Sequence, residues 1–175
     1  MFAVRLSRLV PLAGACLIAL ALLAPALLAP APALAAPRVA QVNAKEDRLL
    51  RQINAARVQA GLRPVTLDRA LITLARDRSA DMANQGYFDH RTPSGTTFLD
   101  MLKARRVPFY MAGEIIAQNN YGAAQTVDQA YAAYMGSAEH RAIIMLSNWK
   151  TVGVGQSVDG HGMYYYTVIF AQPAR

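Results

Sequence analysis

The chain has 175 residues, a formal net charge of +7 and one cysteine, Cys16. A single cysteine excludes an internal disulfide framework. The basic residues are scattered, with only Arg105 and Arg106 adjacent, which excludes the basic run that follows a nucleic-acid backbone. We therefore expect no nucleic-acid partner, and a solvated surface with some affinity for anionic envelope polymers.

Residues 1–35 are predicted to be a secretory signal peptide. Arg5 and Arg8 precede an Ala- and Leu-rich run without charge before Arg38, and Ala33-Leu34-Ala35 matches a small-x-small cleavage signal. Cleavage after Ala35 would leave about 140 residues, close to the commonest size of a single domain. Without Arg5 and Arg8 the cleaved protein would carry a net charge of +5, and it would have no cysteine. We expect it to be secreted or periplasmic, without thiolate chemistry and without stable membrane insertion.

Two other fates of this segment stay open. The apolar run exceeds the roughly 20 residues that span a bilayer, so an uncleaved anchor is one alternative. The four prolines from Pro25 to Pro37 favour an extended, cleavable end instead. The second alternative is a lipoprotein modified at Cys16, which is disfavoured because Cys16 lies in mid-run with Ala13, not leucine, three residues before it.

A short disordered lead-in is expected over residues 36–44, followed by one domain over residues 45–175. From Glu46, apolar residues recur at helical spacing, and Gly61 is a fitting end to this first helix. Asn54 and Arg57 lie partly off its apolar stripe, and we expect them to hold the fold rather than bind a ligand.

The next segments predict two more helices. Residues 63–66 form an extended link, after which Asp68 is a plausible N-cap of a helix that ends at Gly86. A shorter helix is expected from about Thr97 to Arg105, ahead of Pro108.

The second half of the chain predicts strands around a helical pair. Residues 112–118 are rich in β-type apolar residues, and Thr126 is expected to cap the helix that follows. Gly136 breaks this helix, and a further turn or two is expected over residues 138–145. Residues 151–158 and 163–170 predict a hairpin whose second strand is apolar on both faces, as in a central covered strand. These elements predict a three-layer α-β-α sandwich of the α+β class.

Seven short motifs occur in an order that is known from one protein family. They are Ile53-Asn54-x-x-Arg57, Gly61-Leu62, Leu67-Asp68-x-x-Leu71-x-x-x-Ala75, Gly86-Tyr87-Phe88-Asp89-His90, Gly113-Glu114, Ser137-x-x-His140-Arg141 and Gly153-Val154-Gly155. With them the chain resembles the cysteine-free bacterial branch of the CAP superfamily (cysteine-rich secretory, antigen 5, pathogenesis-related 1; also called SCP-like). The resemblance extends from about Leu49 to Phe170.

The resemblance implies a surface cleft lined by two histidines and two acidic residues that hold a divalent metal, often zinc, in many members. His90, Glu114 and His140 match the two histidines and the first acid. The second acid has no match, because Ser137 stands at its position. The candidate ligand-binding cleft is therefore His90, Glu114, Ser137 and His140, and the candidate zinc ligands are His90, Glu114 and His140.

Three other departures from the bacterial pattern concern amide side chains. Ile115, Ile143 and Val168 occupy positions where the pattern has Asn, Asn and Gln. Their joint loss indicates that one buried hydrogen-bond network has been replaced by aliphatic packing, which can be nearly neutral for stability when all partners change together.

These residues support several chemical interpretations. Two imidazoles and one carboxylate could hold zinc with a position open to water, and such a site could hydrolyse a substrate. Alternatively, Glu114 simply hydrogen-bonds the imidazoles and ties loops to helices. Ser137 could be a nucleophile beside His140, but it is better interpreted as the N-cap of the helix that begins at Ala138.

Three functions follow from these interpretations. The leading one is an exported domain that binds a small molecule, divalent metal or envelope partner in the His90/Glu114/His140 cleft, without assignable catalysis. The alternatives are a metal-assisted or serine-type hydrolase that uses the same cleft, and a structural or adhesive scaffold whose cleft is vestigial.

Overall fold

The computed structural model describes residues 42–174. The predicted signal peptide, its two alternatives and most of the predicted lead-in lie outside these residues. The described elements are α1 (Ala44–Gln59), β1 (Thr66–Leu67), α2 (Arg69–Gln85), α3 (Phe98–Ala104), β2 (Met111–Asn119), α4 (Thr126–Gly136), α5 (Ala138–Ile144), β3 (Thr151–Val158) and β4 (Tyr164–Gln172). Within this range no helix has both the length and the apolar character needed to cross a membrane.

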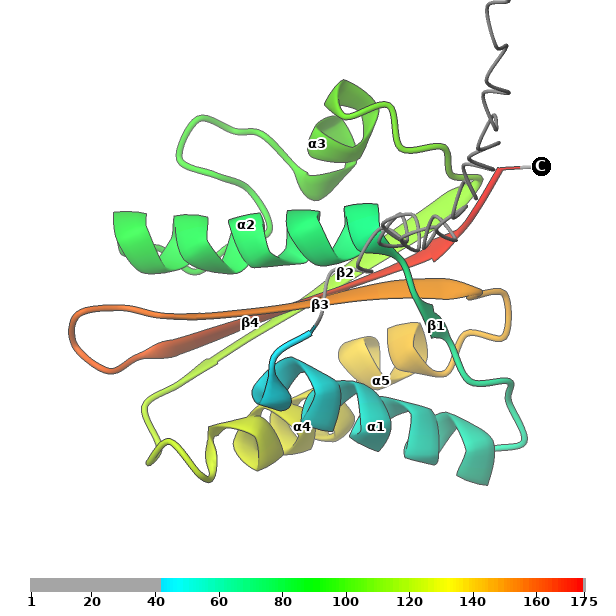
Figure 1. Ribbon diagram of the computed structural model, residues 1–175, viewed down its shortest axis with the longest axis horizontal. Helices are drawn as coiled ribbons and strands as arrows, with labels where there is room; N and C mark the ends of the chain where they lie inside the picture. Colours follow the sequence, from blue (N-terminus) through cyan, green and yellow to red (C-terminus); the bar gives the residue numbers. More distant parts are fainter. Residues whose placement is uncertain (1–41, 175) are drawn as a thin grey trace, which may run out of the picture. The chain divides into compact units, whose positions relative to one another are not determined.

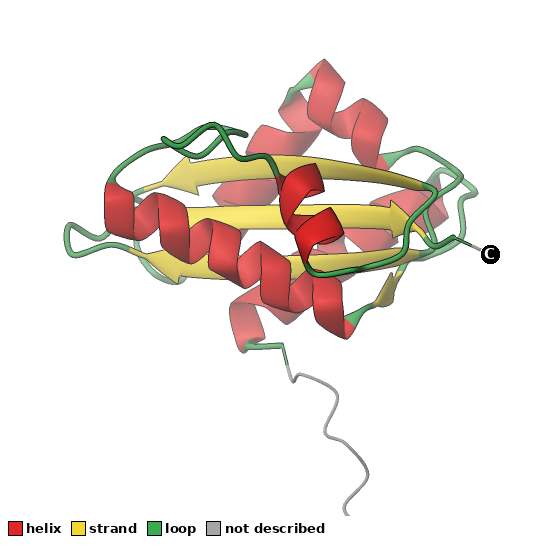
Figure 2. Cartoon of the chain, turned by 90° about the horizontal axis from the view of Figure 1, so that it is seen from above, coloured by secondary structure: helices red, strands yellow, loops and turns green. Residues whose placement is uncertain are grey.

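The strands form one mixed sheet between two layers of helices. Their order is β1-β3-β4-β2, with β1 parallel to β3 and the other neighbours antiparallel. Helices α2 and α3 cover one face, and α1, α4 and α5 cover the other (Figure 1). Seen from above, α2 and α3 lie across the strands (Figure 2). The predicted three-layer α-β-α sandwich of the α+β class is confirmed.

The apolar core occupies both interfaces between the sheet and its helices. On one side it contains Leu49, Ile53 and Tyr134, and on the other Leu71 and Leu102, all of them essentially inaccessible to solvent. Strand β4 is buried at seven consecutive positions, as predicted for a central strand. Burial of this apolar surface is the main stabilising contribution available to a domain without disulfides.

Two glycines of β3 allow α2 to approach the sheet closely. A Cβ atom added to Gly153 would lie 2.0 Å from the carbonyl carbon of Leu71, and one added to Gly155 would lie 2.2 Å from that of Ala75. Both contacts are with helix backbone, which cannot move aside as a side chain does. The Gly153-Val154-Gly155 motif is therefore a packing feature of the α2–β3 interface.

Local capping signals define most helix ends. Asp68 caps α2 through the backbone N–H of Leu71, and Gly86 ends the helix with φ 67°, as predicted. Thr97 caps α3, one residue outside the helix. Helix α1 begins at Ala44, slightly before its predicted start, because Asn43 forms a capping box with Glu46.

The predicted cap of α4 was wrong. Gln125 is the N-cap and makes no side-chain capping bond. The Thr126 hydroxyl instead lies 2.6 Å from the Tyr166 hydroxyl in the core. The Thr126 hydroxyl is therefore hydrogen-bonded to Tyr166 of β4 and does not cap the helix.

Asn54 and Arg57 hold the fold, as predicted. The Asn54 amide donates to the Val65 carbonyl at 3.0 Å and accepts from the Val65 N–H at 2.9 Å. The buried Arg57 guanidinium donates to the carbonyls of Ile144 and Leu146 at 2.5 and 3.0 Å. These bonds fix the chain ahead of β1 and the C-terminal end of α5. The predicted extended link therefore leads into β1, a short strand that sequence reasoning did not identify.

The three substituted amide positions lie together. Ile115 pairs directly with Val168 across β2 and β4, and both are fully buried. Ile143 packs against the same apolar cluster. Their common location supports the replacement of a buried polar network by aliphatic packing.

Candidate functional site

The site is built around Glu114, whose side chain is fully buried on β2. Its Oε1 atom accepts a hydrogen bond from Nε of Arg78 at 3.0 Å. Its Oε2 atom lies 2.8 Å from Nδ1 of His90. Both carboxylate oxygens are thus engaged within the protein, and Glu114 is held between a guanidinium and an imidazole.

Arg78 belongs to α2, which packs on β3 and β4, and its side chain is also fully buried. Besides Glu114, it donates to the Tyr87 hydroxyl at 2.7 Å and to the Asp89 carbonyl at 2.7 Å. The last two contacts fix the loop that follows α2. This loop carries His90, so Arg78 positions both partners of the Glu114–His90 contact.

Sequence reasoning missed Arg78, although the sequence contains a signal for it. Leu71, Ala75, Arg78 and Met82 recur at helical spacing, and all four are buried on the same face of α2. A charged residue inside an apolar stripe requires a buried partner of opposite charge. An arginine within the apolar face of α2 was therefore the sequence feature that could have identified a buried ion pair.

The charges in this cluster stabilise one another. The hydrogen bond to Glu114 raises the pKa of His90, and this effect outweighs the desolvation and the Arg78 charge that lower it. Burial alone would lower the pKa of Arg78, but the charge and hydrogen bond of Glu114 hold it above its ordinary value. The site therefore favours a cationic His90 beside an ion-paired carboxylate.

His140 lies on α5 and completes the predicted set. Its ring packs edge-to-face on Tyr134, with 5.6 Å between ring centroids. Burial lowers the pKa of His140, and the charge of His90 lowers it further, so the two imidazoles lie within electrostatic range of each other. The environments thus separate the two histidines into one that favours the charged form and one that favours the neutral form.

Ser137 acts as the N-cap of α5, as predicted. Its hydroxyl accepts a hydrogen bond from the backbone N–H of His140 at 3.3 Å. This role uses the side chain for helix capping, and it explains a serine at this position without nucleophilic chemistry.

The donor set fits an oriented imidazole better than a three-ligand zinc site. Glu114 faces Arg78 and His90 rather than an open position, and a guanidinium 3.0 Å from the carboxylate opposes a second cation there. Over residues 42–174, no three His, Cys, Asp or Glu side chains are grouped so as to hold a metal ion. The half-exposed His90 ring leaves Nε2 as its second polar atom, available to a ligand.

Other residues considered from the sequence lie outside this cluster. His161 is exposed in the β3–β4 turn. Trp149 is buried and stacks on Phe170 with 5.8 Å between centroids. Tyr165 and Tyr166 are buried in the core. None of these side chains forms an exposed platform for a ligand.

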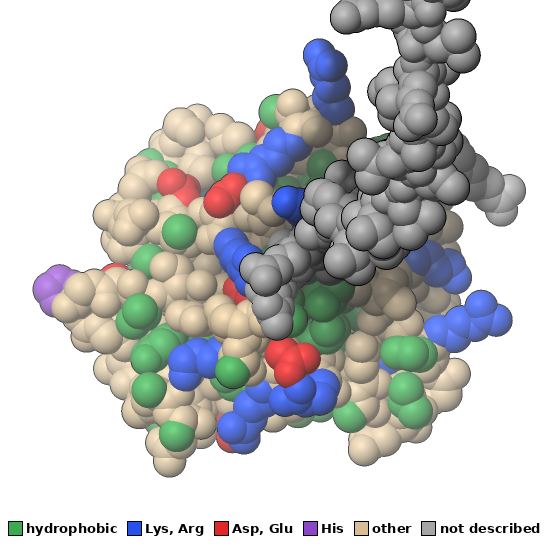
Figure 3. Space-filling view, viewed as in Figure 1, with side chains coloured by type: hydrophobic (Ala, Val, Ile, Leu, Met, Phe, Trp, Pro, Cys, Tyr) green, Lys and Arg blue, Asp and Glu red, His purple; other side chains and the backbone are tan. Residues whose placement is uncertain are grey.

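The surface charges are distributed rather than concentrated. On the visible part of the face in Figure 3, Lys and Arg side chains alternate with Asp and Glu side chains. Partly exposed side chains form ion pairs, such as Arg48 with Asp128 at 2.7 Å and Arg105 with Asp77 at 2.8 Å. This pattern is typical of a solvated surface.

Comparison with known proteins identifies relatives of this chain. A profile described as the cysteine-rich secretory protein family, CAP, matches residues 50–170. The uncharacterized protein YkwD of Bacillus subtilis (strain 168) is 34% identical over 121 residues, which are 69% of this chain and 46% of YkwD. The chain thus spans about half the length of that relative.

Two solved structures share the fold. An extracellular protein containing a SCP domain from Bacillus anthracis str. Ames matches with a TM-score of 0.65 and 25% identity, over 73% of this chain and 40% of the other. An outer surface protein from Borrelia burgdorferi matches with a TM-score of 0.67 and 16% identity, over 74% of this chain and 93% of the other.

Proposed function

Because the chain belongs to the CAP, or cysteine-rich secretory protein, family, we propose that it is an exported protein that binds an anionic envelope ligand through His90 and His140. Glu114 supports this site by orienting His90. The binding chemistry is that of imidazole hydrogen bonds to a carboxylate or phosphate group.

One observation carries this proposal: a fully buried Glu114 bonds to Nδ1 of an imidazole that is half exposed. Burying an ion pair is costly, and such pairs with shifted pKa values concentrate at functional sites. The hydrogen bond between Nδ1 and Glu114 holds the His90 ring in one orientation and leaves Nε2 available to a ligand. The pKa of His90 is raised by its hydrogen bond to Glu114 and that of His140 is lowered by burial, so the first imidazole favours the charged form and the second the neutral form.

A scaffold without ligand binding is the second candidate, and a specific feature favours it. The Arg78–Glu114–His90 contacts join α2, β2 and the loop after α2, which is a stabilising role in itself. The missing second acid points the same way. Hydrolysis has weaker support, because the Ser137 hydroxyl serves as a helix cap.

Imidazole resonances of the purified protein distinguish these functions. Inorganic phosphate, acetate and Zn²⁺ would be added separately while the side-chain signals of His90 and His140 are followed by NMR. We expect phosphate or acetate to move both signals saturably, and His90→Ala to abolish the response. His161→Ala removes an exposed turn histidine and is the matched control, with an unchanged response.

Each outcome selects one function. Signals that respond to none of the three probes would overturn binding and favour the scaffold, and loss of stability in His90→Ala would then report the structural role of the Glu114 contact. Stoichiometric Zn²⁺ that is lost in both variants would assign a metal as the ligand. Turnover of peptide or ester substrates that disappears in Glu114→Ala would identify a hydrolase.

A further inference from the structure

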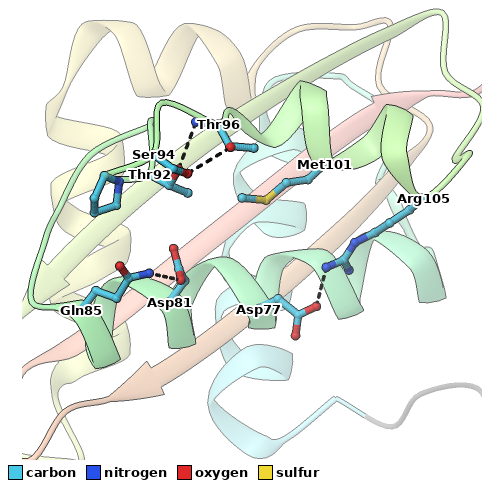
Figure 4. Close-up of a pocket in the computed structure, with 9 residues that line it drawn as sticks. Asp77, Asp81, Gln85, Thr92, Ser94, Thr96, Met101 and Arg105 are labelled. Atoms are coloured by element: carbon cyan, nitrogen blue, oxygen red, sulfur yellow. Dashed lines mark hydrogen bonds and ion pairs between the residues drawn. The ribbon is translucent and has the colours of Figure 1, made fainter.

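A recess that neither His90 nor His140 lines lies between α2 and the segment that leads into α3. Its volume is about 350 Å³, at the lower end of the roughly 300–1,000 Å³ of small-molecule sites. Asp81 and Gln85 of α2 extend into it from one side, and Thr92, Ser94 and Thr96 face them from the other (Figure 4). A space of this size holds a single small molecule or one ring of a larger polymer.

The α2 side of this cavity presents acceptors. The Asp81 carboxylate already accepts hydrogen bonds from Gln85 Nε2 and from the Tyr87 hydroxyl, both at 2.5 Å. Burial raises the pKa of Tyr87 to about 12, so its hydroxyl stays protonated and keeps donating to Asp81. Each carboxylate oxygen has a second lone pair, with which it can accept a hydrogen bond from a ligand in the cavity.

The charge balance of the cavity is negative. Arg105 is paired with Asp77 at 2.8 Å, so these two lining charges offset each other. Arg78 lies 4.0 Å from Asp81, but it also forms the closer buried pair with Glu114. One carboxylate, Asp81, therefore remains as the excess charge of the lining.

The opposite side presents hydroxyl groups in a fixed arrangement. The Thr92 hydroxyl lies 2.8 Å from that of Ser94 and accepts the Thr96 backbone N–H at 3.0 Å. The Ser94 hydroxyl in turn lies 3.3 Å from that of Thr96. A bridge between Arg91 and Thr97 closes this turn, so the three hydroxyls are held in place before any ligand arrives.

From this geometry we propose that the cavity binds one ring of an amino sugar that carries a free ammonium group. The ammonium would face Asp81, and ring hydroxyls would exchange hydrogen bonds with Thr92, Ser94 and Thr96. Met101, which also lines the cavity, offers apolar surface to the C–H groups of the ring. The lining of this cavity contains neither His90 nor His140, although Arg78 contacts both Asp81 and Glu114.

Competing small ligands satisfy only part of this lining. A neutral sugar supplies hydroxyls but no charge for Asp81 beyond the 4.0 Å contact with Arg78. An alkyl diamine supplies charge but has no hydroxyl groups to exchange hydrogen bonds with Thr92, Ser94 and Thr96 as a sugar would. For one sugar ring in an open recess we expect a dissociation constant on the order of 1 mM. Such an affinity becomes useful when many rings of one polymer are presented together.

The test uses D-glucosamine as the probe at neutral pH, with D-glucose and N-acetyl-D-glucosamine as neutral counterparts. Backbone amide signals of the purified, isotope-labelled protein would be followed by NMR. We expect saturable shifts over residues 77–85 and 92–96 with glucosamine, and about tenfold weaker binding of the two neutral sugars because the charged hydrogen bond is lost.

Two variants test the two sides of the cavity, the α2 side with Asp81 and the opposite side with the hydroxyl groups. Asp81→Asn keeps an acceptor for Tyr87 but removes the charge, so binding should weaken about tenfold. Ser94→Ala changes only an exposed loop hydroxyl and should weaken binding by a factor of about three, with the fold intact. Asp128→Asn is the matched control, because Asp128 is an ion-paired carboxylate on α4, on the other side of the sheet.

Three results would each overturn the proposal. They are glucosamine that causes no saturable shift, glucosamine that binds no better than glucose, and glucosamine that binds Asp81→Asn as well as wild type. His90→Ala should leave the glucosamine response unchanged, so failure of this site and failure of the histidine site are distinguishable.

Discussion

At the scale of single residues, Glu114 illustrates how a buried charge constrains its surroundings. Water reaches neither its side chain nor that of Arg78. Each charge is therefore compensated within the protein, chiefly by the other, with His90 beside Glu114 and Asp81 4.0 Å from Arg78. Removing one of the two side chains leaves the other as a buried charge without its chief compensation, which destabilises the folded state.

Replacing Arg78 with Met should lower the free energy of unfolding by about 3–5 kcal/mol, because Glu114 would remain buried without its guanidinium partner. Urea unfolding measures this loss. Arg105→Met breaks a half-exposed pair with Asp77 and should cost less than about 1 kcal/mol. Equal effects of the two substitutions would contradict the view that burial makes the Arg78–Glu114 pair important.

The pH dependence of stability should differ between the two histidines. The pKa of His90 is raised in the folded state, so its contribution to stability is fully present below the ordinary value of 6.5 and is lost as pH rises through the folded pKa. The advantage of wild type over His90→Gln should therefore shrink as the pH rises.

His140 should show the opposite slope. Its pKa is lowered in the folded state, so its contribution is present above the ordinary value of 6.5 and is lost as pH falls through the folded pKa. Urea unfolding of both Gln variants between about pH 5.5 and 8.5 checks these signs. His161→Gln, in an exposed turn, is the control and should run parallel to wild type. Parallel slopes for all three variants would contradict the assigned environments.

At the scale of elements, the position of α2 over β3 determines where Arg78 enters the site. The helix lies directly on a strand that carries glycine at the contact points. This close approach places the buried face of α2 near β2, where the Glu114 carboxylate lies. The loop after α2 places His90 within hydrogen-bonding distance of the same carboxylate.

Gly153→Ala should destabilise the protein by about 3 kcal/mol or more, because the added methyl group would overlap the α2 backbone. Thermal and urea unfolding measure the effect. Gly136, at the end of α4, has open space around its Cβ position, and Gly136→Ala should change stability by less than about 1 kcal/mol. A Gly153→Ala protein as stable as Gly136→Ala would show that α2 can shift away from β3 at little cost.

At the scale of the whole molecule, the domain must be stable without disulfides. No cysteine occurs in residues 42–174, so stability there comes from the core and from buried polar pairs. Reducing agents should therefore leave the unfolding transition unchanged.

We predict cleavage after Ala35, because residues 1–35 have the sequence features of a signal peptide, and the mature protein should then begin at Ala36. Mass spectrometry of the protein recovered from the producing cells and their medium checks the mass of residues 36–175. A chain that retains residues 1–35 in the membrane fraction would indicate an anchor. A lipid mass attached at Cys16 would indicate a lipoprotein.

Signals within a few residues of each other predicted most of the elements. Asp68 and Gly86 enclose α2 because capping and left-handed glycine conformations act within one turn. The fold class followed from the pattern of apolar residues along successive elements. The two-residue strand β1 escaped prediction because its only distinguishing feature is its pairing with β3, more than 80 residues later in the chain.

The candidate site also contains residues that the sequence identified and one that only the tertiary structure revealed. His90, Glu114 and His140 could be selected from the sequence because they match motifs of the family, and Ser137 because it occupies a capping position. The role of Arg78 depended on tertiary structure, since its contact with Glu114 spans 36 residues and that of His90 spans 24. A local pattern can place a charge on the buried face of a helix. Only the order of the strands and the packing of α2 decide which opposite charge it meets, because electrostatic pairing in a protein interior depends on distance in space.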